Sequence, residues 1–202
     1  PTWRALSDEY NSIITVAAKN KTPIGLSGEA WQIFEDAVAD GLEFIFGHRV
    51  KRLGGRKRGQ KVSDMITRTP DDKIMIVDTK ASASKFNIGG PELRPLIEYV
   101  RKQKIRQNGR LEVSAALIVA DQFEQDSERL QELSGEFLAE TGLPLSFLEV
   151  STLLKIVAAM GKSPRARNII SWAQIFCSGG VVTPDKFNRE LSAAVRESHM
   201  GS

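Results

Sequence analysis

The stretch Ile74-Met75-Ile76-Val77-Asp78-Thr79-Lys80 decides both the fold class and the candidate site of this chain of 202 residues. Its first four residues are apolar and rich in β-branched side chains, which is typical of a buried strand. Residues 69–73 before it, Thr-Pro-Asp-Asp-Lys, have the proline and aspartate chemistry of a tight turn. The stretch therefore predicts a strand that follows a turn and ends on a face shared by Asp78 and Lys80.

A second strand is predicted on the other side of this turn, over residues 62–67, where side chains alternate with a period of two. The resulting hairpin brings Asp64 next to Asp78. Two carboxylates on adjacent strands can hold one Mg²⁺, and the ammonium of Lys80 can orient a bound water or neutralise charge on a phosphate. The pattern favours a metal-dependent phosphodiesterase. The alternative is a strand end with solvated charges, because a D-x-K triplet is common in proteins.

Longer stretches resemble the cleavage domain of FokI-type type IIS restriction endonucleases, members of the PD-(D/E)xK nuclease superfamily. The similar segments are residues 76–81 (IVDTKA), 86–88 (FNI), 53–55 (LGG), 98–100 (EYV) and 148–154 (LEVSTLL). Similarity runs from Glu35 to Met160 and, more faintly, to Glu190. The resemblance implies an α/β fold with a restriction-endonuclease-like α/β/α core, a mixed central sheet and flanking helices. It also implies Mg²⁺-dependent DNA cleavage, with Mn²⁺ able to substitute.

The chain departs from the family pattern just before the first aspartate. Ser63 stands where the superfamily has proline, and the loop over residues 55–64 is longer than in FokI. A literal Pro-Asp pair occurs at Pro70-Asp71, but Asp71 lies in the predicted turn, at the wrong end of the hairpin to meet Asp78. We therefore expect Asp64 to be the first metal ligand.

The resemblance also implies roles for neighbouring residues. We expect Asp64, Asp78 and the backbone carbonyl of Thr79 to bind Mg²⁺, and Lys80 to hold the attacking water. Glu35 lies on a predicted helix and is an accessory ligand in this interpretation; the alternative is an ordinary surface glutamate. A contact with a DNA phosphate is expected for Asn87.

Positive charge is concentrated just before Asp64, in a chain with a net charge of +3 and an isoelectric point near 9.1. A basic glycine-containing segment suits a DNA backbone, whose binding would then depend on salt and not on sequence. A solvated loop without a ligand is the alternative. The residues predicted to contact double-stranded DNA here are Arg52, Arg56, Lys57, Arg58 and Lys61.

FokI-type domains cut both strands as homodimers, and the resemblance places the predicted helix over residues 91–107 at that interface. Arg94 and Glu98 occupy the positions of a charged pair in the family, with the order of signs reversed. With the signs reversed, Arg94 of one copy can still meet Glu98 of the other across a two-fold axis. An ordinary i, i+4 pair within the helix explains the same spacing.

One domain is predicted over residues 1–198, with a helical part (1–47), a catalytic core (48–160) and C-terminal helices (161–198); residues 199–202 resemble a cloning scar. Expected helices cover 3–19, 27–47, 91–107 and 126–140, and expected strands 49–53, 62–67, 73–80, 113–120 and 145–149. No apolar run could span a membrane, and no secretion signal or His/Cys cluster occurs, so a bacterial cytoplasmic enzyme without zinc is expected. Cys177 is predicted to be a buried thiol.

No DNA-recognition motif is evident in the sequence, so a separate recognition domain is expected to set the target. Other functions stay open at this point. A non-catalytic DNA-binding module would use the basic segment alone. A protein-interaction domain would use neither the basic segment nor the aspartates. A stand-alone repair or transposition nuclease, or a nicking subunit, would share the predicted chemistry.

Overall fold

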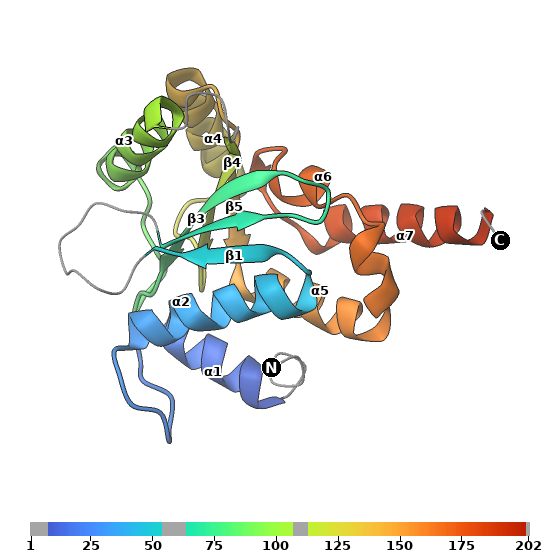
Figure 1. Ribbon diagram of the computed structural model, residues 1–202. Coiled ribbons are helices and arrows are strands. Elements are labelled where there is room, and N and C mark those ends of the chain that lie inside the picture. Colours follow the sequence, from blue (N-terminus) through green and yellow to red (C-terminus); the bar gives the residue numbers. More distant parts are fainter. Residues whose placement is uncertain (1–7, 54–63, 107–112, 201–202) are drawn as a thin grey trace.

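A mixed β-sheet lies between two helical layers in the computed structural model of the chain, which describes residues 8–53, 64–106 and 113–200 (Figure 1). The helices α3 (Gly90–Arg106) and α4 (Ser127–Thr141) cover one face of the sheet. The other face carries α1 (Asp8–Ala18), α2 (Ala30–Asp40), α5 (Val150–Lys162), α6 (Trp172–Phe176) and α7 (Pro184–Met200). This is the predicted restriction-endonuclease-like α/β/α arrangement.

The strands of the described sheet lie side by side in the order in which they occur in the chain. The first three, β1 (Arg49–Arg52), β2 (Met65–Arg68) and β3 (Ile74–Lys80), pair antiparallel as a meander. Then β4 (Val113–Ala120), β5 (Leu145–Glu149) and β6 (Gly180–Val181) continue the sheet in parallel. The mixed sheet is as predicted, and the predicted bounds of β4 and β5 are confirmed.

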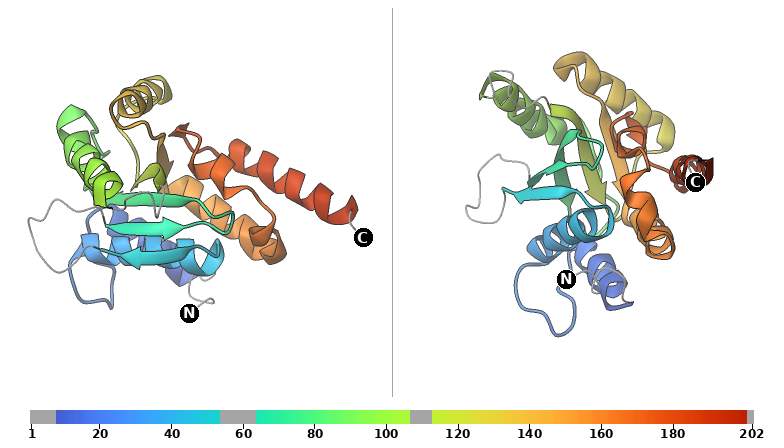
Figure 2. Two further views of the ribbon diagram at one scale, coloured as in Figure 1. Left: turned by 45° about the horizontal axis from the view of Figure 1, so that its top comes forward. Right: turned by 45° about the vertical axis from the view of Figure 1, so that its right-hand side comes forward.

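Alternation along β3 explains why both faces need a helical cover. Met75 and Val77 belong to the core that contains α1, α2 and α5, whereas Ile74 and Ile76 belong to the core under α3 and α4. A strand buried on both faces reads as a continuous apolar run. The three-layer arrangement, seen from two further directions in Figure 2, therefore follows from the sequence of this strand.

Some predicted elements differ from the structure at their ends. The helix expected over residues 27–47 begins at Ala30, with Glu29 and not Ser27 at the N-cap position, because Gly28 has a positive φ of 119° that does not belong to a helix. It ends at Asp40 and gives way to a π-helical turn over Gly41–Ile45. The short strand β6 was not predicted. Cys177 lies at the C-terminal end of α6 and is half-buried, not buried as expected.

Within the described residues, no helix has the length and apolar character needed to cross a lipid bilayer.

Candidate active site

The sheet brings Asp64 and Asp78 together, as the sequence predicted. Met65 of β2 is paired with Val77 of β3, so the residues one step further along, Asp64 and Asp78, lie opposite each other. The backbone amide of Leu53 donates to the carbonyl of Asp64 at 2.7 Å and thereby continues the β1–β2 ladder past its last pair. Side chains at such facing positions have Cβ atoms roughly 5 Å apart, a spacing that lets two carboxylates share one cation.

Thr79 fixes the carboxylate of Asp64. Its backbone amide and its hydroxyl both donate to Oδ2 of Asp64, at 2.5 and 2.6 Å. Burial raises the pKa of Asp64 to about 6, and the nearby charge of Asp78 acts in the same direction, whereas the two bonds from Thr79 lower it. Sequence reasoning assigned Thr79 only a carbonyl role and missed its hydroxyl.

Lys80 lies beside the second carboxylate. Its Nζ is 2.7 Å from Oδ2 of Asp78, and the two side chains are 30% and 11% exposed, so the pair is only partly open to water. Asp78 and Lys80 point the same way because they are two residues apart on β3. The predicted placement of an amine next to the acidic pair is therefore present in the structure.

Glu35 faces the same cluster from α2, which packs against β3. The residue is only 5% exposed, so the surface-glutamate alternative is excluded. Burial raises the pKa of Glu35 to about 7, with further contributions from the charges of Asp64, Asp36 and Asp78. Burial and nearby negative charge thus raise the proton affinity of Glu35 and Asp64, a condition that a bound cation would relieve.

The donor set fits a hard divalent cation that keeps most of its waters. Among the residues the structure describes, no three His, Cys, Asp or Glu side chains form a group arranged to hold a metal ion. The predicted set needs only two carboxylates and a main-chain carbonyl, and Mg²⁺ is ordinarily bound in proteins through one or two carboxylates. The ligand assignment of Asp64, Asp78 and Thr79 stays a prediction.

The turn aspartate Asp71 has a different role from that of a ligand. It lies at the other end of β3, where its Oδ2 accepts a hydrogen bond at 2.8 Å from the backbone amide of Ala173 in α6. The hairpin turn is thereby fastened to the C-terminal helices.

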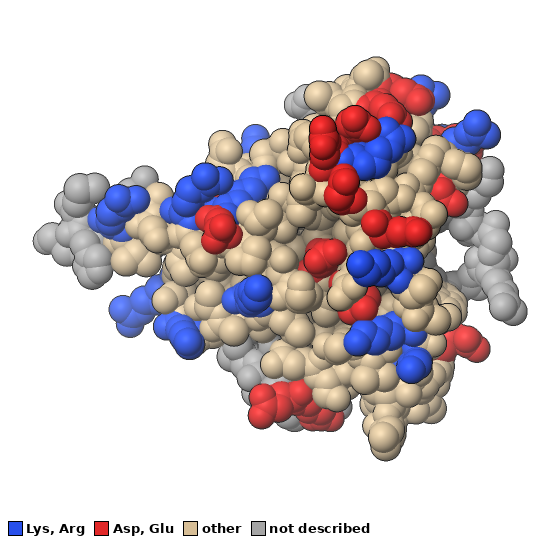
Figure 3. Space-filling model, turned by 180° about the vertical axis from the view of Figure 1, so that it is seen from behind, with Lys and Arg blue, Asp and Glu red and all other residues tan. Residues whose placement is uncertain are grey.

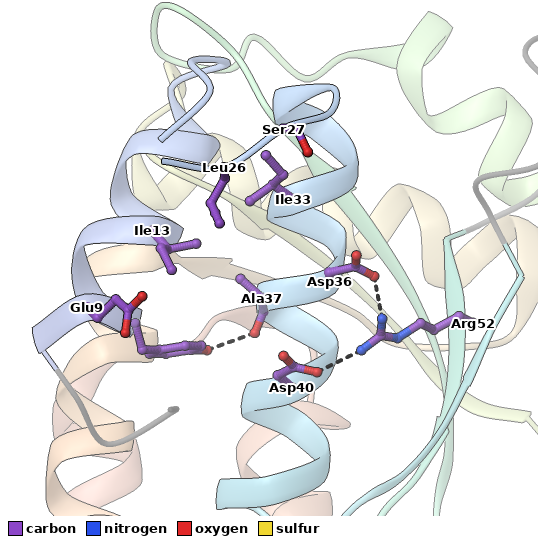
Figure 4. A pocket seen from close by; sticks show the side chains of 10 residues that line it. Glu9, Ile13, Leu26, Ser27, Ile33, Asp36, Ala37, Asp40 and Arg52 are labelled. Atoms are coloured by element: carbon purple, nitrogen blue, oxygen red, sulfur yellow. Dashed lines mark hydrogen bonds and ion pairs between the residues drawn. The ribbon is translucent and has the colours of Figure 1, made fainter. Parts of the chain in front are cut away.

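Arg52 turns toward α2. Its guanidinium forms an ion pair with Asp36 and another, at 2.7 Å, with Asp40 (Figure 4). The three side chains line a pocket of about 280 Å³ between α1 and α2. A DNA contact by Arg52, predicted from the sequence, would have to compete with both carboxylates.

The other predicted site residues lie on exposed segments or outside the described residues. Asn87 is exposed and its Oδ1 accepts a hydrogen bond from Nε2 of Gln125 at 2.6 Å. Arg94 and Glu98 are both exposed on α3, one helical turn apart. Arg56, Lys57, Arg58 and Lys61 lie outside the described residues.

Comparison with known proteins agrees with this geometry. A family model of the FokI cleavage domain matches residues 4–179. The fold and this match define a nuclease cleavage domain of the restriction-endonuclease-like class. The chain belongs to the FokI cleavage-domain family.

Solved structures of the restriction endonuclease FokI share the fold. One matches with a TM-score of 0.61 and 21% identity, covering 77% of this chain and 28% of that chain. FokI bound to DNA matches with a TM-score of 0.64 and 20% identity, covering 87% of this chain and 30% of that chain. The chain thus spans less than a third of the FokI chains it matches. No protein of curated function matches it.

Proposed function

We propose that this chain is a Mg²⁺-dependent DNA endonuclease module that hydrolyses phosphodiester bonds with little sequence preference of its own. The observation that carries the proposal is the convergence of Asp64, Asp78, Lys80 and Glu35 at one end of the β1–β3 meander. Membership of the FokI cleavage-domain family supports it.

Asp64, Asp78 and the carbonyl of Thr79 would hold the cation, with Glu35 as an accessory acceptor for a bound water. A bound Mg²⁺, or Mn²⁺ in its place, stabilises negative charge on the phosphate and lowers the pKa of a coordinated water. Thr79 keeps Asp64 oriented and favours its anionic form through the two bonds to Oδ2.

Lys80 supplies the positive charge nearest to the reacting phosphate. Because its Nζ lies 2.7 Å from Oδ2 of Asp78, a water held beside this carboxylate is within its reach. The ammonium orients the attacking water and stabilises charge in the pentacovalent transition state, and the 3′ oxygen leaves.

Double-stranded DNA is the proposed substrate, with specificity supplied by a separate recognition domain as in a type IIS enzyme. The structure of FokI bound to DNA belongs to a chain more than three times as long as the matched part, which supports a cutting module joined to other domains. A homodimer formed through α3, with Arg94 and Glu98 at the interface, would cut both strands.

Digestion of supercoiled plasmid with and without Mg²⁺ tests the proposal. The wild-type chain should nick the plasmid only with Mg²⁺ or Mn²⁺, and Asp78→Ala should abolish nicking while DNA binding remains. Asp185→Ala, which removes an aspartate from the first turn of α7, is the matched control and should retain full activity. An active Asp78→Ala protein would refute the proposal.

A further inference from the structure

Two arginines face each other at the end of the sheet remote from the acidic cluster. Arg49 at the start of β1 is paired directly with Arg68 at the end of β2. Facing residues on antiparallel strands project from the same side of the sheet, and like charges in such positions repel. A pair of guanidiniums held in this way gains most from an anion placed between them.

The two arginines line a pocket of about 340 Å³ together with Gly47, Thr69, Pro70 and Asp72. Arg167, from the 3₁₀ turn over Pro164–Asn168, lies against one of these lining residues. A Cβ added to Gly47 would lie 3.6 Å from Cδ of Arg167, so the aliphatic part of this arginine packs against the glycine. We call this cavity the arginine pocket, defined by Arg49 and Arg68.

Positive charge exceeds negative charge in the arginine pocket. Its one lining carboxylate, Asp72, pairs with Arg68 at 2.5 Å, and both side chains are exposed. The hydrogen bond from Arg68 lowers the pKa of Asp72, and the charges of Arg68, Arg49 and Lys73 act in the same direction. The neighbouring carboxylate, Asp71, is turned toward α6 and bonded there. Among the described residues, two guanidiniums and the ammonium of Lys73 therefore act on one exposed carboxylate.

A row of cations leads from the arginine pocket toward the acidic cluster. Lys51 lies two residues after Arg49, hence on the same face of β1, and both are exposed. Arg68 lies four residue steps along β2 from Asp64, a span of about 13 Å at roughly 3.3 Å per residue.

We infer that the arginine pocket binds a backbone phosphate of the DNA duplex whose scissile phosphate lies at the acidic cluster. This inference rests on the proposed function. The pocket then has a positioning role, since it fixes the direction of one strand across the open face of β1 and β2 without reading bases.

The salt dependence of duplex binding tests this inference. Binding of a short labelled duplex without Mg²⁺ would be measured over a series of KCl concentrations for the wild type, Arg49→Ala, Arg68→Ala and the double variant. The slope of log affinity against log salt should fall by about one for each arginine removed, and affinity should fall equally for unrelated sequences. Arg129→Ala is the matched control, because this exposed arginine is ion-paired, as Arg68 is, but with Glu132 and Glu136 of its own helix α4. Basic and acidic side chains are interspersed on the face of the molecule shown in Figure 3, so loss of one arginine of mixed surroundings is a fair comparison.

The outcomes separate the inference from the proposed function. If the wild-type protein neither binds nor nicks DNA, the proposed function fails. If it binds and nicks while the double variant keeps the wild-type slope, the inference alone is overturned. A third experiment measures thermal melting in inorganic phosphate. Suppose phosphate raises the melting temperature of the wild type but not of the double variant, while both proteins have the same dependence of DNA affinity on salt. The pocket would then bind a free anion, and the DNA contact would be overturned.

Folding of the variants is checked in the same melting experiment. Removing Arg49 relieves a repulsion, so the melting temperature of Arg49→Ala without phosphate should not fall below that of the wild type. A large fall would show that the arginines serve the fold, and would overturn the inference.

Discussion

Thr79 donates two hydrogen bonds to one oxygen of Asp64, from its amide at 2.5 Å and from its hydroxyl at 2.6 Å. The two residues lie on neighbouring strands, and the bonds oppose the burial that raises the pKa of this carboxyl. A residue between the two predicted catalytic positions of β3 thus controls the orientation and charge of a carboxylate on another strand. Partners of this kind commonly change metal affinity by one to two orders of magnitude.

Thr79→Val removes the hydroxyl but keeps the shape and the backbone donor. We expect the Mg²⁺ concentration that gives half-maximal plasmid nicking to rise about tenfold, with activity recovered at high Mg²⁺. Thr79→Ser keeps the hydroxyl and should behave like the wild type. An unchanged Mg²⁺ requirement in Thr79→Val would show that the backbone bond alone positions Asp64.

The raised pKa of Glu35, about 7 in the fold against 4.5 for the free side chain, predicts how stability depends on pH. Between these values the folded protein binds more protons than the unfolded chain, so this contribution to stability falls as pH rises through the window. After allowance for solvent screening, the loss is on the order of 2 kcal/mol.

Mg²⁺ should therefore raise the melting temperature more at pH 8 than at pH 6, because the cation replaces the lost protons. Glu35→Gln keeps the size of the side chain and removes its titration. In this variant the pH dependence of melting without metal should be flatter between pH 5 and 7 than in the wild type. If the melting temperature changed equally with pH in the wild type and in Glu35→Gln, the pH dependence could not be assigned to Glu35.

His48 has a pKa near 3, because burial among Phe46, Trp172 and Phe176 disfavours its charged form. The unfolded chain binds a proton near pH 6.5, so stability is lost as pH falls from that value toward 3. At pH 5 the loss is on the order of 2 kcal/mol. Urea unfolding at pH 7 and pH 5, followed by tryptophan fluorescence, measures it.

A double variant isolates the His48 contribution. Nδ1 of His48 lies 3.1 Å from the hydroxyl of the buried Thr67, so His48→Phe alone leaves that hydroxyl without its partner and should cost about 1–3 kcal/mol. Combining His48→Phe with Thr67→Val removes both polar groups. The double variant should lose less stability between pH 7 and pH 5 than the wild type; an identical loss would exclude His48 as its source.

Charge reversal on α3 tests the proposed dimer. Arg94 and Glu98 are exposed one helical turn apart, as an isologous contact requires. Arg94→Glu should slow the conversion of nicked plasmid to linear product while leaving first-strand nicking intact. Adding Glu98→Arg should restore linear product, since the two signs are then merely exchanged. Absence of rescue would remove this pair from the interface.

The sequence was sufficient where local pattern and tertiary environment agree. The run from Ile74 to Val77 is apolar on both faces, and β3 is buried on both faces. Prediction from the sequence failed where pairing with a strand distant in the chain decides the structure. β6 is only two residues long and is made a strand by its pairing with Ser146 and Phe147, which no periodicity of its own could indicate.

The candidate site shows the same division. The hairpin pattern predicted that Asp64 meets Asp78, since register follows from the strands themselves. The burial of Glu35 and the ion pairs of Arg52 depend on how α2 packs against the meander. The sequence of the helix around Glu35 and that of the basic residues before Asp64 do not indicate how α2 contacts the strands. From sequence alone, Glu35 was therefore either a ligand or a surface residue, and Arg52 was predicted to contact DNA.

In the described sheet the order of strands in space repeats their order along the chain, so each strand after β1 emerges from the ribosome when its neighbour is already made. Glu35, Asp64, Asp78 and Lys80 all emerge before β4, the strand that covers the second edge of β3. A nascent chain halted at Lys80 would carry the whole acidic cluster on an unsupported meander. The strands made after Lys80 therefore brace a cluster whose acidic residues are already complete in the chain.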